Sequence, residues 1–189
     1  MRLVLATQNA HKLREFRRLL EGVELVALPE AVQLPPETGS TFAENAWPKA
    51  RSVAAAIGLA AIADDSGIES QALAGGPGVR SARYAGERAS DAENLDRLRR
   101  EVPVGSGLRY VCALAYVEPD RDREQLFTGR CHGTMATQPR GDGGFGYDPI
   151  FVPDEARDGR TMAELSDSEK DAISHRGDAA RQLLAWLRG

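Results

Sequence analysis

The amino-acid sequence predicts an α/β protein with a mixed β-sheet and helices on both faces of that sheet. Up to residue 63, short apolar runs alternate with amphipathic helical patterns, which is typical of parallel strands joined by helices. Residues 109–138 are instead rich in strand-forming side chains, which favours antiparallel strands. The length of 189 residues fits one domain spanning 1–189, or one domain with two lobes.

The chain opens with a predicted strand, a short polar turn and a helix. Residues 2–6, RLVLA, are an apolar run bounded by polar residues, which indicates a buried strand. Apolar side chains recur at helical spacing between residues 10 and 22, with charged side chains on the opposite face. Asn9 or Thr7 is suited to cap the start of this helix, and Gly22 is suited to end it.

A second strand and a second helix follow. Residues 23–28, VELVAL, predict a short strand, and a proline-rich loop separates it from the helix. Thr41 as N-cap and Glu44 three residues later form a capping-box pattern, and Gly58 marks the end of the helix. Pro48 lies inside this helix, where it removes a backbone hydrogen bond and favours a kink.

The rest of the chain is predicted to be richer in strands. Residues 59–63, LAAIA, predict a third buried strand that ends at the polar stretch 64–67. Ser166 and Glu169 form another capping-box pattern, and Ser174 is suited to cap a final helix. The other predicted elements are a helix at 90–102, strands at 109–117, 124–138 and 149–152, a turn at 118–124, and one broken or two consecutive helices at 166–189.

Composition argues against several classes of protein. The formal net charge is −4, whereas proteins that grip polymeric DNA or RNA usually carry a basic face. The chain has no run of 18 or more apolar residues, so we expect no membrane span, and its short apolar N-terminal run does not fit a signal peptide. Cys112 and Cys131 lie in no CxxC pattern, so we expect a cytoplasmic chain without disulfides. His132 beside Cys131 supplies only two zinc ligands, which make no site.

The stretch ATQNAHK, residues 6–12, is the first of four with a pattern that suits a chemical role. It leads from a strand into a helix, whose unpaired N–H groups and dipole favour an anion such as phosphate. Lys12 adds a positive charge in the first turn of that helix. The stretch lacks the GxxxxGK pattern of a Walker A loop, and an ordinary strand–helix turn is the alternative interpretation.

The second stretch, IADDSG, places two aspartates and a serine after an apolar strand. In an open α/β sheet, the loops after the carboxyl ends of strands line the ligand crevice. Neighbouring aspartates repel each other, so their presence is reasonable where a divalent cation or a general-base role uses the charge. A solvated turn is the alternative, because Asp-Ser-Gly is common turn chemistry.

The third stretch is GGFGYDPIFVP, residues 143–153, in which glycines precede and separate aromatic residues. Glycine lets a backbone approach a ligand closely, and a planar base could stack on Phe145 and Tyr147. Asp148 is able to accept hydrogen bonds from such a ligand. The alternative is an aromatic plug that packs the loop against the core.

The fourth stretch is SEKDAISHR, residues 168–176, which is rich in hydrogen-bond donors. Lys170, His175 and Arg176 gather positive or donor groups in an acidic protein. An ordinary helix surface is the alternative, because lysine and arginine are common there.

Taken together, these stretches follow one another in a recognisable order. LVLATQNAHKLREF, ETGSTFAENA, IADDSGIE, GGPGVRSARYAG, GGFGYDPIFVP and TMAELSDSEKDAISHRG cover nearly the whole chain, which resembles the inosine triphosphate pyrophosphatase family of XTP/dITP diphosphatases. The resemblance implies a long mixed sheet flanked by helices, with two lobes and a central cleft. It also implies hydrolysis of ITP, dITP and XTP to the nucleoside monophosphate and pyrophosphate, with magnesium as cofactor and a homodimer as the assembly.

The resemblance also implies a role for individual residues. Asp65 is implied to be the proton acceptor and a magnesium ligand, and Ser66 is implied to touch the substrate. His175 and Arg176, as donors, would match the 6-keto oxygen of such a purine, whereas adenine presents an amino donor there. The full set implied to bind the substrate is Thr7, Gln8, Asn9, Ala10, His11 and Lys12 for the triphosphate, Phe145, Gly146, Tyr147 and Asp148 for the base and sugar, and Ser66, Lys170, His175 and Arg176.

The chain departs from the family pattern at two places. Family members often carry two acids before the TG of the ETG motif, whereas Pro36 precedes Glu37 here, so the second magnesium ligand is either Glu37 or, next, Glu44. Gln8 stands where glycine or serine is often found. Two other functions stay open: a pyrophosphatase for modified pyrimidine nucleotides, and an inactive nucleotide sensor, for which a lost acid in DDSG would be expected.

Overall fold

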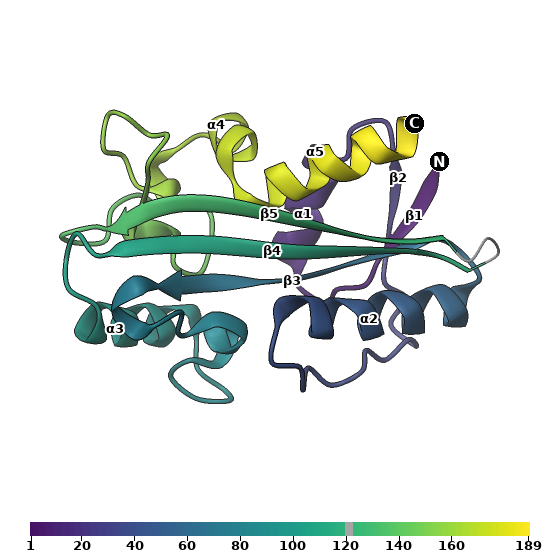
Figure 1. Ribbon diagram of the computed structural model, residues 1–189, viewed down its shortest axis with the longest axis horizontal. Helices are drawn as coiled ribbons and strands as arrows, with labels where there is room; N and C mark the ends of the chain where they lie inside the picture. The colour runs from purple at the N-terminus through teal and green to yellow at the C-terminus, as the bar shows by residue number, and fades with distance from the viewer. Residues whose placement is uncertain (120–122) are drawn as a thin grey trace. The chain divides into compact units, whose positions relative to one another are not determined.

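The computed structural model describes residues 1–119 and 123–189 and contains a mixed six-stranded sheet, as predicted (Figure 1). The strand order is β2-β1-β3-β4-β5-β6; β1 pairs in parallel with β2 and β3, and β5 pairs antiparallel with β6. The predicted turn at 118–124 lies partly outside the described residues. In chain order the strands are β1 (Arg2–Leu5), β2 (Glu24–Ala27), β3 (Ala61–Ser70), β4 (Gly107–Glu118), β5 (Arg123–Met135) and β6 (Phe151–Pro153).

The helices begin close to the residues that the sequence predicts. Asn9 caps the first helix, because its Oδ1 accepts hydrogen bonds from the N–H groups of His11 and Lys12. Thr41 caps the second through the N–H of Glu44, and Ser166 forms the predicted capping box with Glu169. The α-helices are α1 (Ala10–Leu19), α2 (Phe42–Ile57), α3 (Asp91–Glu101), α4 (Asp167–Ile173) and α5 (His175–Arg188), and short 3₁₀ turns lie at η1 (Gln71–Leu73), η2 (Gly78–Arg83), η3 (Asp148–Ile150) and η4 (Met162–Glu164).

Strand β3 is longer than the sequence predicts. The prediction ends it before residues 64–67, but the strand continues to Ser70, so the DDSG motif lies inside the sheet. The prediction of a loop at this motif is therefore wrong. Aspartate and glycine are disfavoured in strands, which hides such a strand from sequence patterns. A glycine is needed here because a Cβ on Gly67 would overlap Ser81 Oγ and lie 2.6 Å from the carbonyl oxygen of Gly78.

The chain divides into two compact units, and β3, β4 and β5 contribute residues to both. Unit 1 comprises Met1–Asp65, Cys112–Gly129 and Arg176–Gly189, and unit 2 comprises Ser66–Val111 and Arg130–His175. Two of the four boundaries fall inside motifs that the sequence singles out. One separates Asp65 from the serine that follows it, and the other separates His175 from Arg176.

The core of unit 1 lies on both faces of its strands. On one face, Phe16 of α1 and Leu183 of α5 pack with Leu5, Ile62 and Leu114 of the sheet, and all five side chains are fully buried. Helix α2 buries a separate face of small side chains, which are Ala46, Ala50, Val53 and Ala54. The sheet of unit 1 is thus enclosed by helices on two sides, as the sequence predicts.

The core of unit 2 joins α3 to the segments around the glycine loop. Leu98 of α3 packs with Ile68 of β3 and Met135 of β5, and Tyr147 and Phe151 join the same cluster. Tyr147 also donates a hydrogen bond to the carbonyl oxygen of Ser81 at 2.7 Å. The loop that carries the FGYD motif is therefore anchored in this core.

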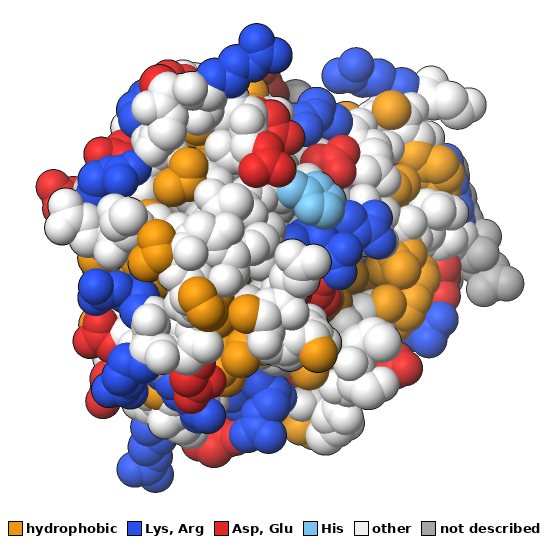
Figure 2. Space-filling model, turned by 60° about the vertical axis from the view of Figure 1, so that its left-hand side comes forward, with side chains coloured by type: hydrophobic (Ala, Val, Ile, Leu, Met, Phe, Trp, Pro, Cys, Tyr) orange, Lys and Arg blue, Asp and Glu red, His pale blue; other side chains and the backbone are white. Residues whose placement is uncertain are grey.

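The surface carries charges of both signs. On the face drawn in Figure 2, Lys and Arg side chains are interspersed with Asp and Glu side chains rather than gathered in one basic area. Within residues 1–119 and 123–189, no helix combines the length and apolar character needed to cross a membrane. Cys112 and Cys131 are buried thiols.

Candidate active site

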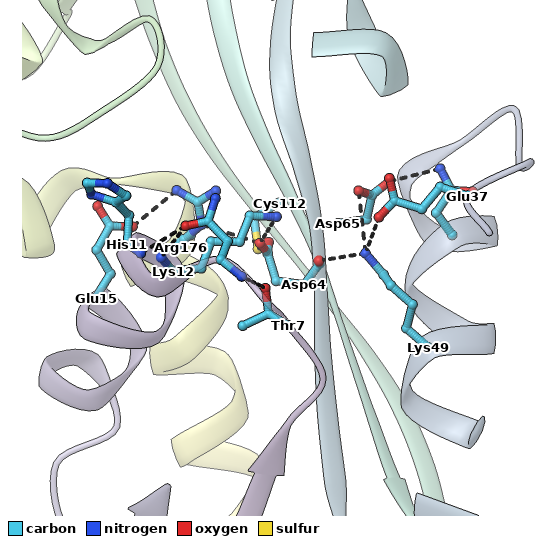
Figure 3. A network of polar contacts seen from close by, with 12 residues as sticks. Thr7, His11, Lys12, Glu15, Glu37, Lys49, Asp64, Asp65, Cys112 and Arg176 are labelled. Carbon is cyan, nitrogen blue, oxygen red and sulfur yellow. Dashed lines mark hydrogen bonds and ion pairs between the residues drawn. The ribbon is translucent and has the colours of Figure 1, made fainter. Parts of the chain in front are cut away.

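The two aspartates of the DDSG motif are both buried in β3, where they point to opposite faces of the sheet (Figure 3). Successive side chains of a strand alternate in direction, so covalent neighbours have different surroundings. Asp64 faces α1 and α5, from which Lys12 and Arg176 reach it. Asp65 faces α2, which brings Lys49 beside it.

The surroundings of Asp65 suit a carboxylate that accepts a proton. Its Oδ2 accepts a hydrogen bond from Asn45 Nδ2 at 3.0 Å, and its Oδ1 lies 3.7 Å from Lys49 Nζ. Burial raises the pKa of Asp65 above its ordinary value; the charge of Glu37 raises it further, while Lys49 and Asn45 act in the opposite direction. A carboxylate with a raised pKa is a stronger base at neutral pH than an exposed one.

Lys49 holds the acids on this face together. Its Nζ donates to Glu37 Oε1 at 2.6 Å and to the carbonyl oxygen of Asp64 at 3.0 Å, in addition to its proximity to Asp65. The Lys49 side chain is 5% exposed, so this ammonium is desolvated and depends on those oxygens. One buried cation therefore links the ETG loop to the DDSG strand.

Glycine at position 39 lets the ETG loop approach α2. The N–H of Gly39 donates to Asn45 Oδ1 at 2.7 Å, and a Cβ on this residue would lie 2.6 Å from Glu44 Cβ. Glu44 directs its carboxylate to the N–H and hydroxyl of Ser40, which lower its pKa. Of the two acids considered as a second metal ligand, Glu37 is the one that shares Lys49 with Asp65.

Sequence reasoning missed Asn45 and Lys49. They lie four residues apart in α2 and therefore project from the same helix face, although the other buried residues of α2 are apolar. Two polar residues at buried positions of an apolar helix face are unusual, since lysine is almost never fully buried without a partner. This pattern was the signal from which the sequence could have predicted that Asn45 and Lys49 have buried polar partners.

The surroundings of Asp64 are those of a charge anchor. Its Oδ2 lies 2.7 Å from Lys12 Nζ and 3.4 Å from Arg176 Nε, and its Oδ1 accepts a hydrogen bond from Cys112 Sγ at 3.0 Å. Burial alone would raise the pKa of Asp64, but the two cations and these hydrogen bonds lower it well below its ordinary value. Arg176 Nη1 also pairs with Glu15 Oε2 at 3.1 Å. Sequence reasoning weighed Asp64 only as one of the paired acids of DDSG, with a cation or general-base role, and assigned no role to Glu15 or Cys112.

The loop before α1 borders a cavity in unit 1. The cavity has a volume of about 350 Å³ and is lined by Thr7 to Ala10, Leu13 and residues 27–30. Two of the N–H groups that favour an anion at this helix end, those of His11 and Lys12, already donate to Asn9 Oδ1. His11 Nδ1 also contacts Arg14 at 2.8 Å. An anion in this loop would therefore compete with the N-cap for those two donors.

In unit 2, Asp148 is the centre of a buried polar cluster. Its Oδ2 accepts from Lys170 Nζ at 2.7 Å and from the N–H of Phe145 at 3.0 Å, and its Oδ1 accepts from the hydroxyl of Tyr110 at 3.0 Å. His175 stacks on the ring of Tyr110, with ring centroids 4.6 Å apart. The structure thus brings together Lys170, Asp148 and His175 through one tyrosine.

The glycines of this loop make room for the protein's own side chains. A Cβ on Gly144, whose φ is +70°, would overlap Asp148 Oδ2 and lie 3.1 Å from Lys170 Nζ. Tyr147 is buried in the core, where its ring packs as the alternative interpretation of an aromatic plug expects. Phe145 is half-buried, with Lys170 Nζ 5.2 Å from its ring centroid, and Gly146 N–H donates to Asp91.

The acids on the Asp65 face have the chemistry of a divalent cation site. Mg²⁺ prefers oxygen ligands and is usually held by one or two carboxylates together with substrate phosphates and waters. Asp65 and Glu37 supply two such carboxylates, and their mutual repulsion is already balanced by the Lys49 ammonium. Among the described residues there is no group of three or more His, Cys, Asp or Glu side chains placed to hold a metal ion. The two carboxylates therefore fit a cation that also takes oxygens from its substrate.

The family model described as the Ham1 family matches residues 3–186 of the chain. The chain belongs to the Ham1 family. This Ham1 protein is 48% identical over 201 residues to a protein from Frankia alni named dITP/XTP pyrophosphatase, covering 100% of this chain and 98% of the relative. It is also 48% identical over 198 residues to the protein of that name from Mycobacterium tuberculosis, covering 99% of this chain and 95% of the relative.

Solved structures of Ham1 proteins have the same fold. The HAM1 protein from Coxiella burnetii is 43% identical and superposes with a TM-score of 0.85, covering 100% of this chain and 98% of the other. The nucleoside-triphosphatase, or dITP/XTP pyrophosphatase, from Mycobacterium abscessus is 45% identical with a TM-score of 0.72, covering 99% of each chain. The α/β fold with a mixed sheet and flanking helices is thereby confirmed.

Proposed function

We propose that this Ham1 protein hydrolyses the non-standard purine nucleoside triphosphates ITP, dITP and XTP to the nucleoside monophosphate and pyrophosphate. The observation that carries the proposal is the buried Asp65 carboxylate, whose pKa is raised and which shares Lys49 with Glu37. The support from relatives is that proteins named dITP/XTP pyrophosphatase match this chain along its whole length.

In the proposed mechanism, Asp65 accepts the proton of the attacking water, whose oxygen forms a bond to the α-phosphorus as the bond to pyrophosphate breaks. Asn45 holds Asp65 Oδ2 and so fixes the orientation of the carboxylate. Lys49 and Lys12 place positive charge where a triphosphate gathers negative charge. A magnesium ion held by Asp65 and Glu37 would stabilise the charge on the phosphate oxygens.

The proposal gives the nucleoside to residues of the FGYD and SHR motifs. The half-buried ring of Phe145 is the aromatic surface offered to a base, and the donors of His175 and Arg176 are offered to its 6-keto oxygen. Arg176 also forms ion pairs with Asp64 and Glu15, so an experiment must separate its role in base recognition from its role in these ion pairs. Replacing Arg176 by alanine should lower the ratio of kcat/KM for ITP over ATP at least about tenfold. Equal losses for the two substrates would show that Arg176 does not recognise the base and acts only through its ion pairs with Asp64 and Glu15.

Pyrophosphate release tests the proposed function. Release from ITP and XTP should be much faster than from GTP, ATP or dUTP, and it should need magnesium. Faster release from dUTP would favour the pyrimidine nucleotide enzyme, and binding of ITP without turnover would favour the inactive sensor. The proposal also includes the cytoplasmic location and the homodimer that the family resemblance implies. Light scattering, which measures molar mass, tests the homodimer.

A further inference from the structure

Four charged side chains form a buried cluster on the α1 and α5 side of β3. The acids are Asp64 and Glu15, and the bases are Lys12 and Arg176, so the cluster is electrically balanced. Asp64 is its most enclosed member, with a side chain that is fully buried, whereas the Lys12 side chain is 15% exposed. Lys12 is thus the member with the most access to a ligand, and Asp64 has none.

We infer that Asp64 is a positioning residue, which holds Lys12 in place for the triphosphate and Arg176 in place for the base; this rests on the proposed function. Both bases converge on the same oxygen, Oδ2, at 2.7 and 3.4 Å. The other oxygen, Oδ1, accepts from Cys112 Sγ at 3.0 Å, which fixes the rotation of the carboxylate. With both oxygens occupied and no access to solvent, Asp64 acts on a substrate only through the residues that it holds.

The contact leaves Lys12 able to act on phosphate. An ammonium has three N–H donors, and one bond to Asp64 fixes the long, flexible side chain. Ordering the side chain in advance reduces the entropy that binding would otherwise cost. The opposing effect is electrostatic, because the negative charge of Asp64 weakens the attraction between Lys12 and an anion. The two effects predict opposite results when that charge is removed.

The test is a double-mutant cycle of Asp64→Asn and Lys12→Met, with Asp96→Asn on the exposed side of α3 as the matched control. Calorimetry measures binding of inorganic tripolyphosphate, and kinetics give kcat/KM for ITP. If Asp64 positions Lys12, Asp64→Asn should weaken tripolyphosphate binding and lower kcat/KM at least tenfold. In binding of tripolyphosphate, which has no base for Arg176 to contact, the double variant should fall within about threefold of Lys12→Met alone. Asp96→Asn should match the wild type.

Two results would overturn the inference. Tighter tripolyphosphate binding by Asp64→Asn would show that the carboxylate only neutralises Lys12. A double variant whose loss equals the product of the two single losses would show that Asp64 acts independently of Lys12. If Asp64→Asn does not fold, the double variant, which keeps the cluster balanced, should still fold and match Lys12→Met; its failure to fold also counts against the inference.

The binding measurement separates this inference from the proposed function. Coupling between the two substitutions in tripolyphosphate binding, without turnover of ITP by the wild type, would support the positioning role and reject the proposed reaction. If the wild type turns over ITP but the two substitutions have independent effects on tripolyphosphate binding, the proposed reaction is supported and the positioning role is rejected.

Discussion

Asp64 and Asp65 are covalent neighbours in β3, yet the two faces of the strand give them opposite properties. On one face, Lys12 and Arg176 converge on Asp64 and hold its pKa well below the ordinary value. On the other, burial outweighs the contact with Lys49 and raises the pKa of Asp65. The two pKa values differ because two cations, Lys12 and Arg176, contact Asp64, whereas among the described residues Lys49 alone lies beside Asp65. The DDSG motif itself does not determine this difference.

This contrast assigns the two acids to different tasks. Where the surroundings push the pKa values of two nearby groups apart, the group with the raised value is suited to proton transfer and the other to holding charge. Asp65 therefore has the properties of a base, and Asp64 has those of an anchor. A DDSG motif read as a string of letters does not distinguish them.

The largest expected effect is on turnover by Asp65→Asn. The substitution removes the proposed proton acceptor but keeps the volume and an oxygen for the bond from Asn45, so kcat for ITP should fall at least about 10³-fold in a folded protein. Circular dichroism checks the fold, and kinetics measure the loss. Asp65→Asn that keeps more than a few per cent of the activity would break the comparison, because Asp65 would then not be the base.

A smaller loss is expected from Lys49→Met. Without the ammonium, Glu37 and Asp65 repel each other unopposed, so kcat/KM should fall roughly 100-fold. Lys49 lowers the pKa of Asp65, so its removal should raise that pKa and move the acid limb of the pH–rate profile to higher pH. Arg51→Met, on the exposed side of the same helix, is the control. An unchanged acid limb would show that Asp65 does not depend on Lys49.

Stability should change in opposite directions for the two aspartates. Asp64 has a depressed folded-state pKa, so its contribution to stability is complete above the unfolded value and is lost as the pH falls below it. At pH 7, Asp64→Asn should therefore lower Tm, by roughly 6–12 °C for loss of a buried ion pair. Asp65 has a raised pKa, so its charge costs stability at pH 7, and Asp65→Asn should raise Tm. Scanning calorimetry measures the Tm of both variants. Tm changes of the same sign would contradict the contrast between the two aspartates.

Local patterns in the sequence predicted local structure well. The strand at 2–6, the N-cap at Asn9 and the capping box at Ser166 depend on residues within a few positions of one another, and all three are present. The prediction failed where tertiary contacts outweigh local preference. Strand β3 continues through two aspartates because ion pairs from distant elements compensate for their charges, which no pattern within the strand reveals.

The candidate site was predictable in part. Family motifs named Asp65 and Lys12, but spacing did not reveal that Lys49 or Asp64 would be their partners, since the Lys12–Asp64 and Lys49–Glu37 contacts form only when the chain has folded. The glycine loop illustrates the same limit. Its composition suggested close approach to a ligand, whereas Gly144 makes room for the Asp148–Lys170 ion pair of the protein itself.

The carboxyl titration of the two aspartates tests the central contrast most directly. Carbon-13 NMR of the metal-free protein, with signals assigned from the Asp64→Asn and Asp65→Asn variants, follows each carboxyl separately as the pH changes. We expect Asp65 to titrate above the ordinary aspartate pKa of about 3.9 and Asp64 to titrate below it. Two coincident titrations near the ordinary pKa, or the reverse order, would contradict the account.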